Sequence, residues 1–271
     1  MKWITRKEPG RRTKDPPTQT LIVEALSKLP VGRAFGSDKI AAEAAAMLIA
    51  AAPTMWAVLG VLTHDTTIRA WLEENAPDVL CIQETKVVDD AFPREGFEAL
   101  GYELSIFGQR TYNGVAIASK LPIEDTETGL PLADDEEARG IAATIGGVRI
   151  VGIYVPNGRE AGTDKYEYKL RWLDALRAWL DDRYDLAQPL VVAGDFNMTP
   201  YSTRYGNLRR DSGLRRASGG LNTTWPALMT PLGLALDHFL VGAKVRRAAM
   251  RVGPRLWSDY RPIIGTFELG P

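Results

Sequence analysis

The stretch PLVVAGDFN, residues 189–197, joins a short apolar run to two polar residues, Asp195 and Asn197. A run that is rich in β-branched residues and bounded by Pro, Gly or Asp is typical of a strand. Further runs of this kind are DVLCIQ, GVAIAS, GIAATIG, VRIVGIYV, LALDHFLVG and IIGTFEL, whereas TIRAWLEENA and KYEYKLRWLDALRAWLDDRY have the apolar spacing of helices. Many strands with few helices between them favour packed sheets with helices outside them.

Composition sets the broad class of the protein. The chain has 271 residues, of which 45% are hydrophobic and 25% charged, and these values exclude a disordered or fibrous protein. The net charge is −1, so a polyanionic partner would have to be held by local basic patches. The single cysteine, Cys81, lies in an apolar run, which excludes an intramolecular disulfide and suits a reducing compartment. We therefore expect a cytoplasmic protein.

Residues 1–55 differ from the rest and are predicted to form a partly helical extension, with the main domain at 56–271. The first twenty residues are basic and lack the apolar core of a secretory signal. LIVEALSKL, residues 21–29, is interpreted as one short amphipathic helix. Residues 40–62 form an apolar run long enough to raise a transmembrane interpretation, since a span needs roughly 20 residues. Glu43, Pro53 and the many alanines favour a packed helix followed by a strand, so no membrane association is expected.

Polar residues stand at or near the ends of several predicted strands, and those positions are candidates for chemistry. They are Glu84, Tyr154, Asn157, Asp195, Asn197, Asp237 and Asp259. Clustered carboxylates bind a hard cation such as Mg²⁺, while amide and phenol groups can donate hydrogen bonds to a phosphate. If these strand ends converge, the sequence predicts metal-assisted phosphodiester hydrolysis. Any one of these residues taken alone is more often a cap or turn residue.

The ordered motifs DVLCIQETK, YNGVAIASK, IYVPNG, GDFN, LDHFLV and SDYRP resemble those of the endonuclease/exonuclease/phosphatase superfamily. Residues 76–180 are most similar to its exodeoxyribonuclease III (AP endonuclease) group. Residues 189–269 resemble shorter members with TWP and IDH motifs. The resemblance implies a DNase I-like fold, which is a four-layer α/β sandwich of two packed mixed β-sheets flanked by helices.

The resemblance also implies roles for the residues of these motifs. Asp195 would position or deprotonate the attacking water or protonate the leaving oxygen, and Asn197 would orient Asp195 and the phosphate. Tyr154 and Asn157 would contact the scissile phosphate. Asp237 would be the acid that holds the catalytic histidine of the family.

Metal and further substrate contacts follow from the same motifs. Glu84 would be the ligand of Mg²⁺, with Mn²⁺ as an alternative metal, and Asp259 would lie near the ion. Asn113 of YNGV and Trp225 of TTWP would contact the substrate. A buried core tryptophan is an equally good interpretation of Trp225.

Two departures from the family pattern bear on activity. Tyr260 stands where the family has a histidine after the Ser-Asp pair. A positioned acid or base contributes about 10²–10⁴-fold, and a phenol of pKa ~10 can donate a hydrogen bond but is no base at neutral pH. In addition, VLTHDTTIRAWL occupies the place of the family's first strand, where an asparagine helps to hold the metal. Asp65 would suit Mg²⁺ there, His64 would favour a softer metal, and a surface turn is the alternative for both.

The sequence thus predicts divalent-metal-dependent hydrolysis of phosphodiesters, with DNA that carries an abasic site or a 3′ end as the expected partner and substrate. Reduced activity is expected because of Tyr260. The alternative is an inactive pseudoenzyme, or an assembled scaffold, that keeps the fold and binds nucleic acid. Arginines that cluster after GDFN and after LDHFLV could contact phosphates or be solvated loop charges. No protein partner is implied.

Overall fold

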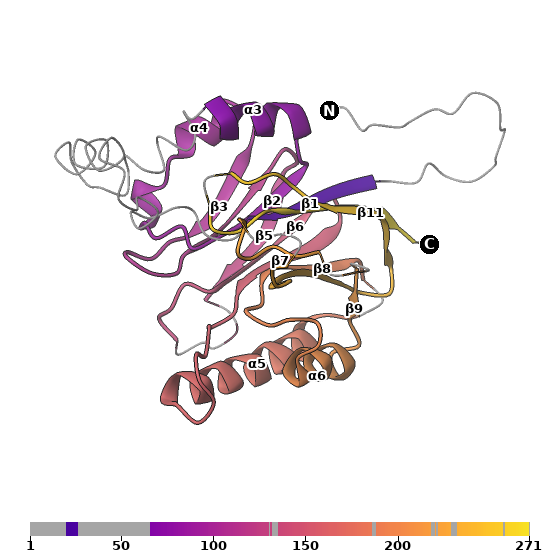
Figure 1. The fold of residues 1–271 in the computed structure, drawn as a ribbon. Coiled ribbons are helices and arrows are strands. Elements are labelled where there is room, and N and C mark those ends of the chain that lie inside the picture. Colours follow the sequence, from indigo (N-terminus) through magenta and orange to yellow (C-terminus); the bar gives the residue numbers. More distant parts are fainter. Residues whose placement is uncertain are drawn as a thin grey trace.

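The computed structural model describes residues 20–26, 66–129, 131, 135–185, 188–217, 220, 222–228, 232–256 and 258–270. Their strands form two sheets (Figure 1). Sheet A has the order β11 (Val245–Val252), β12 (Ile263–Leu269), β1 (Thr20–Leu26), β2 (Val79–Gln83), β4 (Val115–Ser119) and β3 (Glu103–Phe107). Sheet B has the order β5 (Ile123–Thr128), β6 (Gly140–Ile145), β7 (Val148–Tyr154), β8 (Leu190–Asp195), β10 (Asp237–Val241) and β9 (Arg215–Arg216).

Both sheets are mixed, and each lies between the other sheet and a layer of helices (Figure 1). The strands β1 and β2 pair in parallel, as do β7 and β8, while the remaining neighbours are antiparallel. Outside sheet A lie α3 (Thr66–Asn75), the short helix η1 (Asp89–Ala91) and α4 (Arg94–Glu98). Outside sheet B lie α5 (Asp164–Arg183) and α6 (Thr203–Asp211). The predicted four-layer α/β sandwich is therefore confirmed.

Three apolar clusters fill the spaces between these layers. The cluster between the sheets contains Cys81, Ile117, Ile150 and Phe239, all fully buried. A second cluster packs sheet B against α5 and α6, and a third packs sheet A against α3 and α4. Because alternate residues of a strand face opposite sides, each central strand supplies two of these clusters. This is why runs such as DVLCIQ and PLVVAGDF are apolar almost throughout.

The predicted helices over residues 67–76 and 165–184 are confirmed as α3 and α5. The prediction of a helix over LIVEALSKL is wrong, because residues 20–26 form β1. This strand pairs with β12 on one side and with β2 on the other, so both of its edges are hydrogen-bonded in the sheet. Pairing with distant strands outweighs a local helical spacing. Residues 66–72, the end of VLTHDTTIRAWL, begin α3, so the strand parallel to β2 is β1 and not this segment.

The extension predicted over residues 1–55 therefore contributes a strand to sheet A, while the boundary predicted at residue 55 lies outside the described residues. His64, Asp65 and the apolar run 40–62 also lie outside them. Among the helices that the structure describes, none has the length and apolar character needed to cross a membrane.

Candidate active site

A row of polar side chains crosses three neighbouring strands at one end of sheet B. Tyr154 of β7 is in register with Asp195 of β8, and Asp195 is in register with Asp237 of β10. Residues in register point to the same side of a sheet, as do residues two apart on one strand. Ala193 is two residues from Asp195, Phe239 is two residues from Asp237, and both belong to the cluster between the sheets. The row therefore faces sheet A. Both aspartates are buried. Strand register thus aligns two carboxylates and a phenol where the apolar core ends.

The turn after β8 fixes the orientation of Asp195. The main-chain N–H of Asn197 donates to Asp195 Oδ1 at 2.7 Å, and Asn197 Nδ2 donates to the carbonyl of Val155 at 2.8 Å. Asn197 has φ +48°, a left-handed conformation that asparagine tolerates better than most residues. The sequence GDFN therefore builds a turn in which its last residue orients its acid and ties this turn to the end of β7.

Glu84 follows β2 of sheet A and faces the row from the opposite sheet. Its Oε2 lies 2.8 Å from Lys86 Nζ, and its carboxylate accepts a hydrogen bond from the Tyr154 hydroxyl. Burial raises the pKa of Tyr154, and Glu84 and Asp195 raise it further. The Tyr154 phenol is therefore held neutral, as a hydrogen-bond donor, between two carboxylates that come from different sheets.

Tyr260 is buried beside the two aspartates of the row. Burial is the largest cause that raises the pKa of its phenol, followed by the charges of Asp195, Asp237 and Asp259. Its main-chain N–H donates to Ser258 Oγ at 3.0 Å, which holds the short segment before β12 in place. The side chain thus faces the acids of the site as a neutral phenol. Because its pKa is raised, it stays protonated and does not act as a base.

The predicted substrate residues lie around this centre. Asn157 is exposed, and its Oδ1 accepts the N–H of Arg159 at 3.3 Å. Asn113 is buried with φ +59°, its Nδ2 donates to Gln109 Oε1 at 3.1 Å, and its carbonyl accepts the N–H of Lys86 at 2.9 Å. Asn113 thus braces the turn that carries Glu84, whereas Asn157 is open to a ligand.

Trp225 and Asp259 contact each other at the edge of the site. Trp225 is partly exposed, which does not fit a core tryptophan. Its Nε1 donates to Asp259 Oδ2 at 3.4 Å, and its ring centroid lies 6.4 Å from that of Tyr260. The carbonyl of Asp259 accepts the N–H of Ala227 at 2.8 Å, so the 222–228 segment and the segment before β12 are joined.

The sequence matches a known family. Residues 58–259 fit the model of the endonuclease/exonuclease/phosphatase family. The chain belongs to this family. It is 27% identical to exodeoxyribonuclease III of Haemophilus influenzae over 259 residues, which cover 77% of this chain and 97% of that protein.

Solved structures agree with this membership. The structure of the 3′ phosphatase NExo from Neisseria, bound to product DNA hairpin, is 26% identical, with a TM-score of 0.69 over 90% of this chain and 98% of that one. An AP endonuclease from Archaeoglobus fulgidus is 24% identical, with a TM-score of 0.68 over 90% and 98% of the two chains, and it shares the fold.

The family resemblance implies a divalent metal, and the donors present fit one in part. Among the residues that the structure describes, no three His, Cys, Asp or Glu side chains come together to hold an ion. Mg²⁺ usually takes only one or two protein carboxylates and keeps several waters. Glu84 offers a hard oxygen donor at the site, although Lys86 pairs with it, and Asp259 is exposed beside Trp225. Glu84 is thus the residue best placed to hold the metal of this family.

Two cations near the row were missed in the sequence. The guanidinium of Arg139 lies 4.9 Å from the ring centroid of Tyr154 and donates to its carbonyl at 3.4 Å. Lys169 of α5 is buried and donates to the carbonyls of Asn157 and Asn197. A signal for Lys169 was present, because it lies at helical spacing from Trp172, Leu173 and Leu176, which are all buried. A lysine on the apolar side of a helix indicates an internal role.

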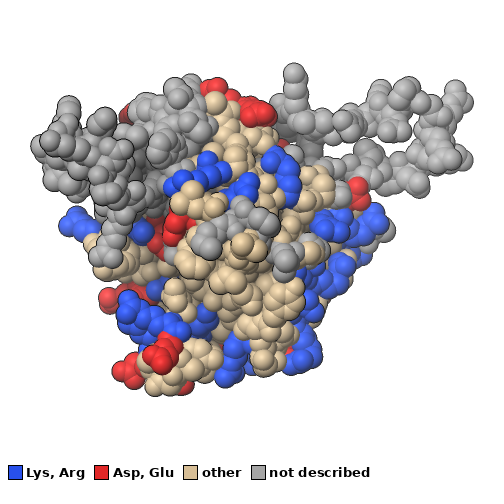
Figure 2. Space-filling view, viewed as in Figure 1, with Lys and Arg blue, Asp and Glu red and all other residues tan. Residues whose placement is uncertain are grey.

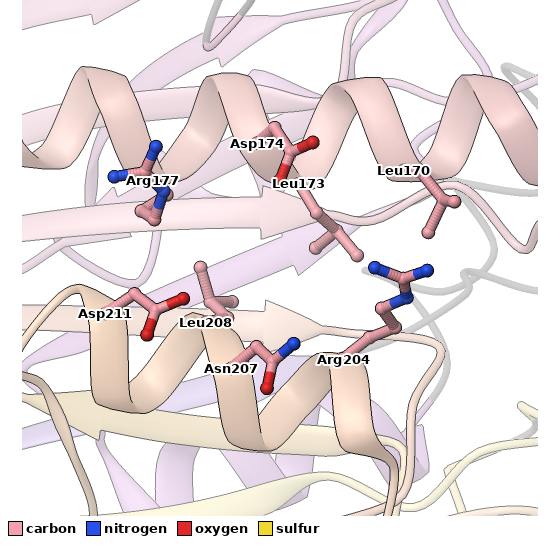
Figure 3. Close-up of a pocket in the computed structure, with 8 residues that line it drawn as sticks. All are labelled: Leu170, Leu173, Asp174, Arg177, Arg204, Asn207, Leu208 and Asp211. Atoms are coloured by element: carbon pink, nitrogen blue, oxygen red, sulfur yellow. The ribbon is translucent and has the colours of Figure 1, made fainter.

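One pocket of the described residues lies between α5 and α6 (Figure 3). It is lined by Leu170, Leu173, Asp174, Arg177, Arg204, Asn207, Leu208 and Asp211. Leu173 and Leu208 belong to the cluster outside sheet B, whereas the row faces sheet A. Basic side chains do not form one continuous surface on the face that Figure 2 shows, where Lys and Arg occur in several groups separated mainly by residues without charge. The candidate site is therefore defined by the row and not by this pocket.

Proposed function

We propose that this protein hydrolyses phosphodiester bonds in DNA with the help of a divalent metal, as an exodeoxyribonuclease III-like enzyme. The observation that carries the proposal is the register of Tyr154, Asp195 and Asp237, with Asn197 bonded to Asp195 and Glu84 bonded to Tyr154. Similarity to an exodeoxyribonuclease and to a phosphatase bound to product DNA supports DNA as the substrate class. Duplex DNA with an abasic site or a 3′ end is the substrate that we propose.

The residues of the row take distinct parts in this proposal. Asp195 orients the attacking water and accepts its proton, because its carboxylate is fixed by the N–H of Asn197. Tyr154 donates a hydrogen bond towards a phosphate oxygen, for which its neutral phenol is suited. Asn157 is exposed and contacts the phosphate from the adjoining loop.

A bound Mg²⁺ or Mn²⁺ would neutralise charge on the phosphate and on the leaving oxygen. Glu84 would hold it, and Asp259 would contact it through water or directly. Asp65 is a further proposed ligand. Lys86, which pairs with Glu84, would then turn from this carboxylate towards the phosphate or the solvent.

Tyr260 sets the expected rate. In the resembling sequences a histidine stands at this position, and Asp237 would hold it. A neutral phenol can donate a hydrogen bond to the phosphate but does not accept the proton of water at neutral pH. Asp195 remains as the proposed base, and we propose an enzyme that is slower by about 10²–10⁴-fold than one that also carries a histidine at position 260.

The deciding experiment is incision of a duplex with one abasic site, and of a duplex with a 3′ phosphate, with Mg²⁺ or with chelator. The parent protein, Tyr260→His and Tyr260→Phe are compared, and Glu84→Ala serves as the variant without the proposed metal ligand. We expect slow metal-dependent cleavage by the parent, faster cleavage by Tyr260→His and loss in Glu84→Ala.

A second candidate function is favoured by the same residue. If Asp195 alone does not suffice without a histidine at position 260, the protein would bind DNA without cutting it. Salt-sensitive binding of the duplex with no product from the parent under any divalent metal, together with metal-dependent cleavage by Tyr260→His, would support this second function and would exclude the first.

A further inference from the structure

Lys169 is a buried cation outside the row of acids. It lies on α5, and its residue is 5% exposed. Its Nζ donates to the carbonyl of Asn197 at 2.8 Å and to the carbonyl of Asn157 at 3.3 Å. One ammonium group therefore bonds the two loops that follow the parallel strands β7 and β8.

These two loops carry the amides that the proposed function needs. Asn197 Nδ2 already donates to the carbonyl of Val155, and the N–H of Val155 donates to the carbonyl of Asp195 at 2.9 Å. Lys169 of α5 adds hydrogen bonds to both loops from the side of the helix. The two loops are thus held to each other by main-chain, side-chain and helix contacts, and a shift of one would move the other.

Burial of this ammonium is costly, so its presence needs a reason. Its Nζ donates to two neutral carbonyls, and a charged group that is transferred from water to such an environment loses stability. Burial lowers the pKa of Lys169 to about 8, while the nearby charge of Asp195 raises it. An apolar side chain of the same length would fill the space without this cost, but it could not donate to either loop.

Gly158 provides the space for the stem of Lys169. A Cβ atom at Gly158 would lie 2.6 Å from Lys169 Cδ, and its φ is +73°. The glycine of the YVPNG motif therefore permits both the turn and the approach of the lysine. A side chain there would displace the ammonium without removing it, which gives a second and independent way to test its role.

We propose that Lys169 is a positioning residue, which sets the loop of Asn157 against the loop of Asn197 so that both amides and Asp195 face one phosphate. This inference deepens the proposed function and rests on it. The lysine does not touch the substrate; it acts through the two carbonyls. Misplacement of catalytic groups by about 1 Å costs on the order of 10²-fold in rate.

The test compares Lys169→Met with Lys165→Met, an exposed lysine one helical turn earlier on α5. Both are made in the Tyr260→His background, and kcat and KM are measured on the abasic duplex. We expect Lys169→Met to lower kcat by about 10²-fold with a smaller change in KM, and Lys165→Met to change neither. Lys169→Arg, which keeps the charge and donors, should recover part of the loss, and Gly158→Ala should reproduce it. An unchanged kcat in Lys169→Met would overturn the proposal.

A measurement without catalysis separates this inference from the proposed function. Hydrogen exchange of the Asn197 main-chain N–H, which donates to Asp195 Oδ1, reports the order of the loop. We expect this exchange to be at least about tenfold faster in Lys169→Met than in Lys165→Met, while amides in β6 stay protected. If no variant cleaves DNA but this difference is found, the proposed function fails and the loop-positioning role stands. Equal exchange in the two variants would overturn that role whatever the activity.

Discussion

Asp237 and His238 are neighbours in β10, yet they lie in different environments. Asp237 faces sheet A, opposite Asp195, at the end of the core between the sheets. His238 faces the helices, where its ring lies 4.6 Å from that of Tyr205, and its Nε2 contacts the carbonyl of Met198 at 2.8 Å. Both are buried. The difference follows from the alternation of side chains along a strand.

The two faces therefore hold polar groups for different reasons. On the inner face, acids stand in a row with Tyr154 and meet Glu84 and Tyr260 from sheet A and its loops. On the outer face, the one histidine of β10 is packed among Phe196 and Tyr205. Changes on the inner face should alter catalysis more than stability, and changes on the outer face should do the reverse.

The largest effect is expected for Asp195→Asn. This change keeps the shape of the side chain and removes the carboxylate that would accept the proton, so kcat should fall by about 10²–10⁴-fold. The free energy of unfolding should change much less than the rate, because asparagine keeps an oxygen that can accept the N–H of Asn197. The value of kcat is measured by DNA cleavage in the Tyr260→His background, and the free energy of unfolding is measured with urea. A variant that loses stability but keeps its rate would reverse the roles of the two faces.

The next effect concerns His238 and pH. The pKa of His238 is lowered to about 3, mainly by burial. A histidine in the unfolded chain has a pKa of about 6.5. The unfolded chain then binds more protons between these values, so stability is full above pH ~6.5 and is lost as the pH falls towards 3. Between pH 7 and pH 5 this amounts to about 2 kcal/mol from His238 alone.

His238→Gln tests this pH dependence, because glutamine can donate to the Met198 carbonyl and does not titrate. The free energy of unfolding is measured by urea at pH 7 and pH 5 for both proteins. We expect the variant to lose about 2 kcal/mol less than the parent over this interval. Parallel losses would mean that the histidine is not the group that titrates, and the outer face would lose its assigned role.

The sequence predicts the inner face better than its surroundings. Runs such as VRIVGIYVPN and PLVVAGDFN indicate buried strands with polar ends, and the resemblance supplies the order of these strands. The sequence leaves open whether these ends converge, and the register found in the structure brings Tyr154, Asp195 and Asp237 into one row. Local pattern suffices for the strands and their polar ends, because each lies within one short segment, whereas the pairing of the strands does not follow from it.

Other parts of the site depend on contacts that no local pattern contains. The partners of β1 are β2 and β12, which are far away in the sequence, and the helical spacing of LIVEALSKL favours the wrong structure. Arg139 precedes β6, and only the fold places it over the ring of Tyr154. Lys169 could have been found on the apolar side of its helix, but its acceptors could not, since they are main-chain carbonyls of two separate loops.

The smallest expected effect is a gain in stability from Asp237→Asn. Asp237 and Asp195 stand directly opposite each other in an antiparallel pair, where like charges are unfavourable and such pairs contribute about 0.2–1 kcal/mol. The asparagine keeps the main-chain pairing of β10 and the contact of its own N–H with Thr224 Oγ1. The free energy of unfolding at pH 8 should therefore rise by up to about 1 kcal/mol.

Asp259→Asn is the matched control, because Asp259 is an exposed acid of the same site. Its substitution should change stability by less than about 0.5 kcal/mol, as is usual for exposed positions. A gain in Asp237→Asn alone would mean that the protein keeps an unfavourable pair of buried acids, as expected where strand register serves chemistry and not folding. A loss would instead assign the Asp237 carboxylate a structural hydrogen bond that asparagine cannot replace, and the inner face would then stabilise the fold as the outer face does.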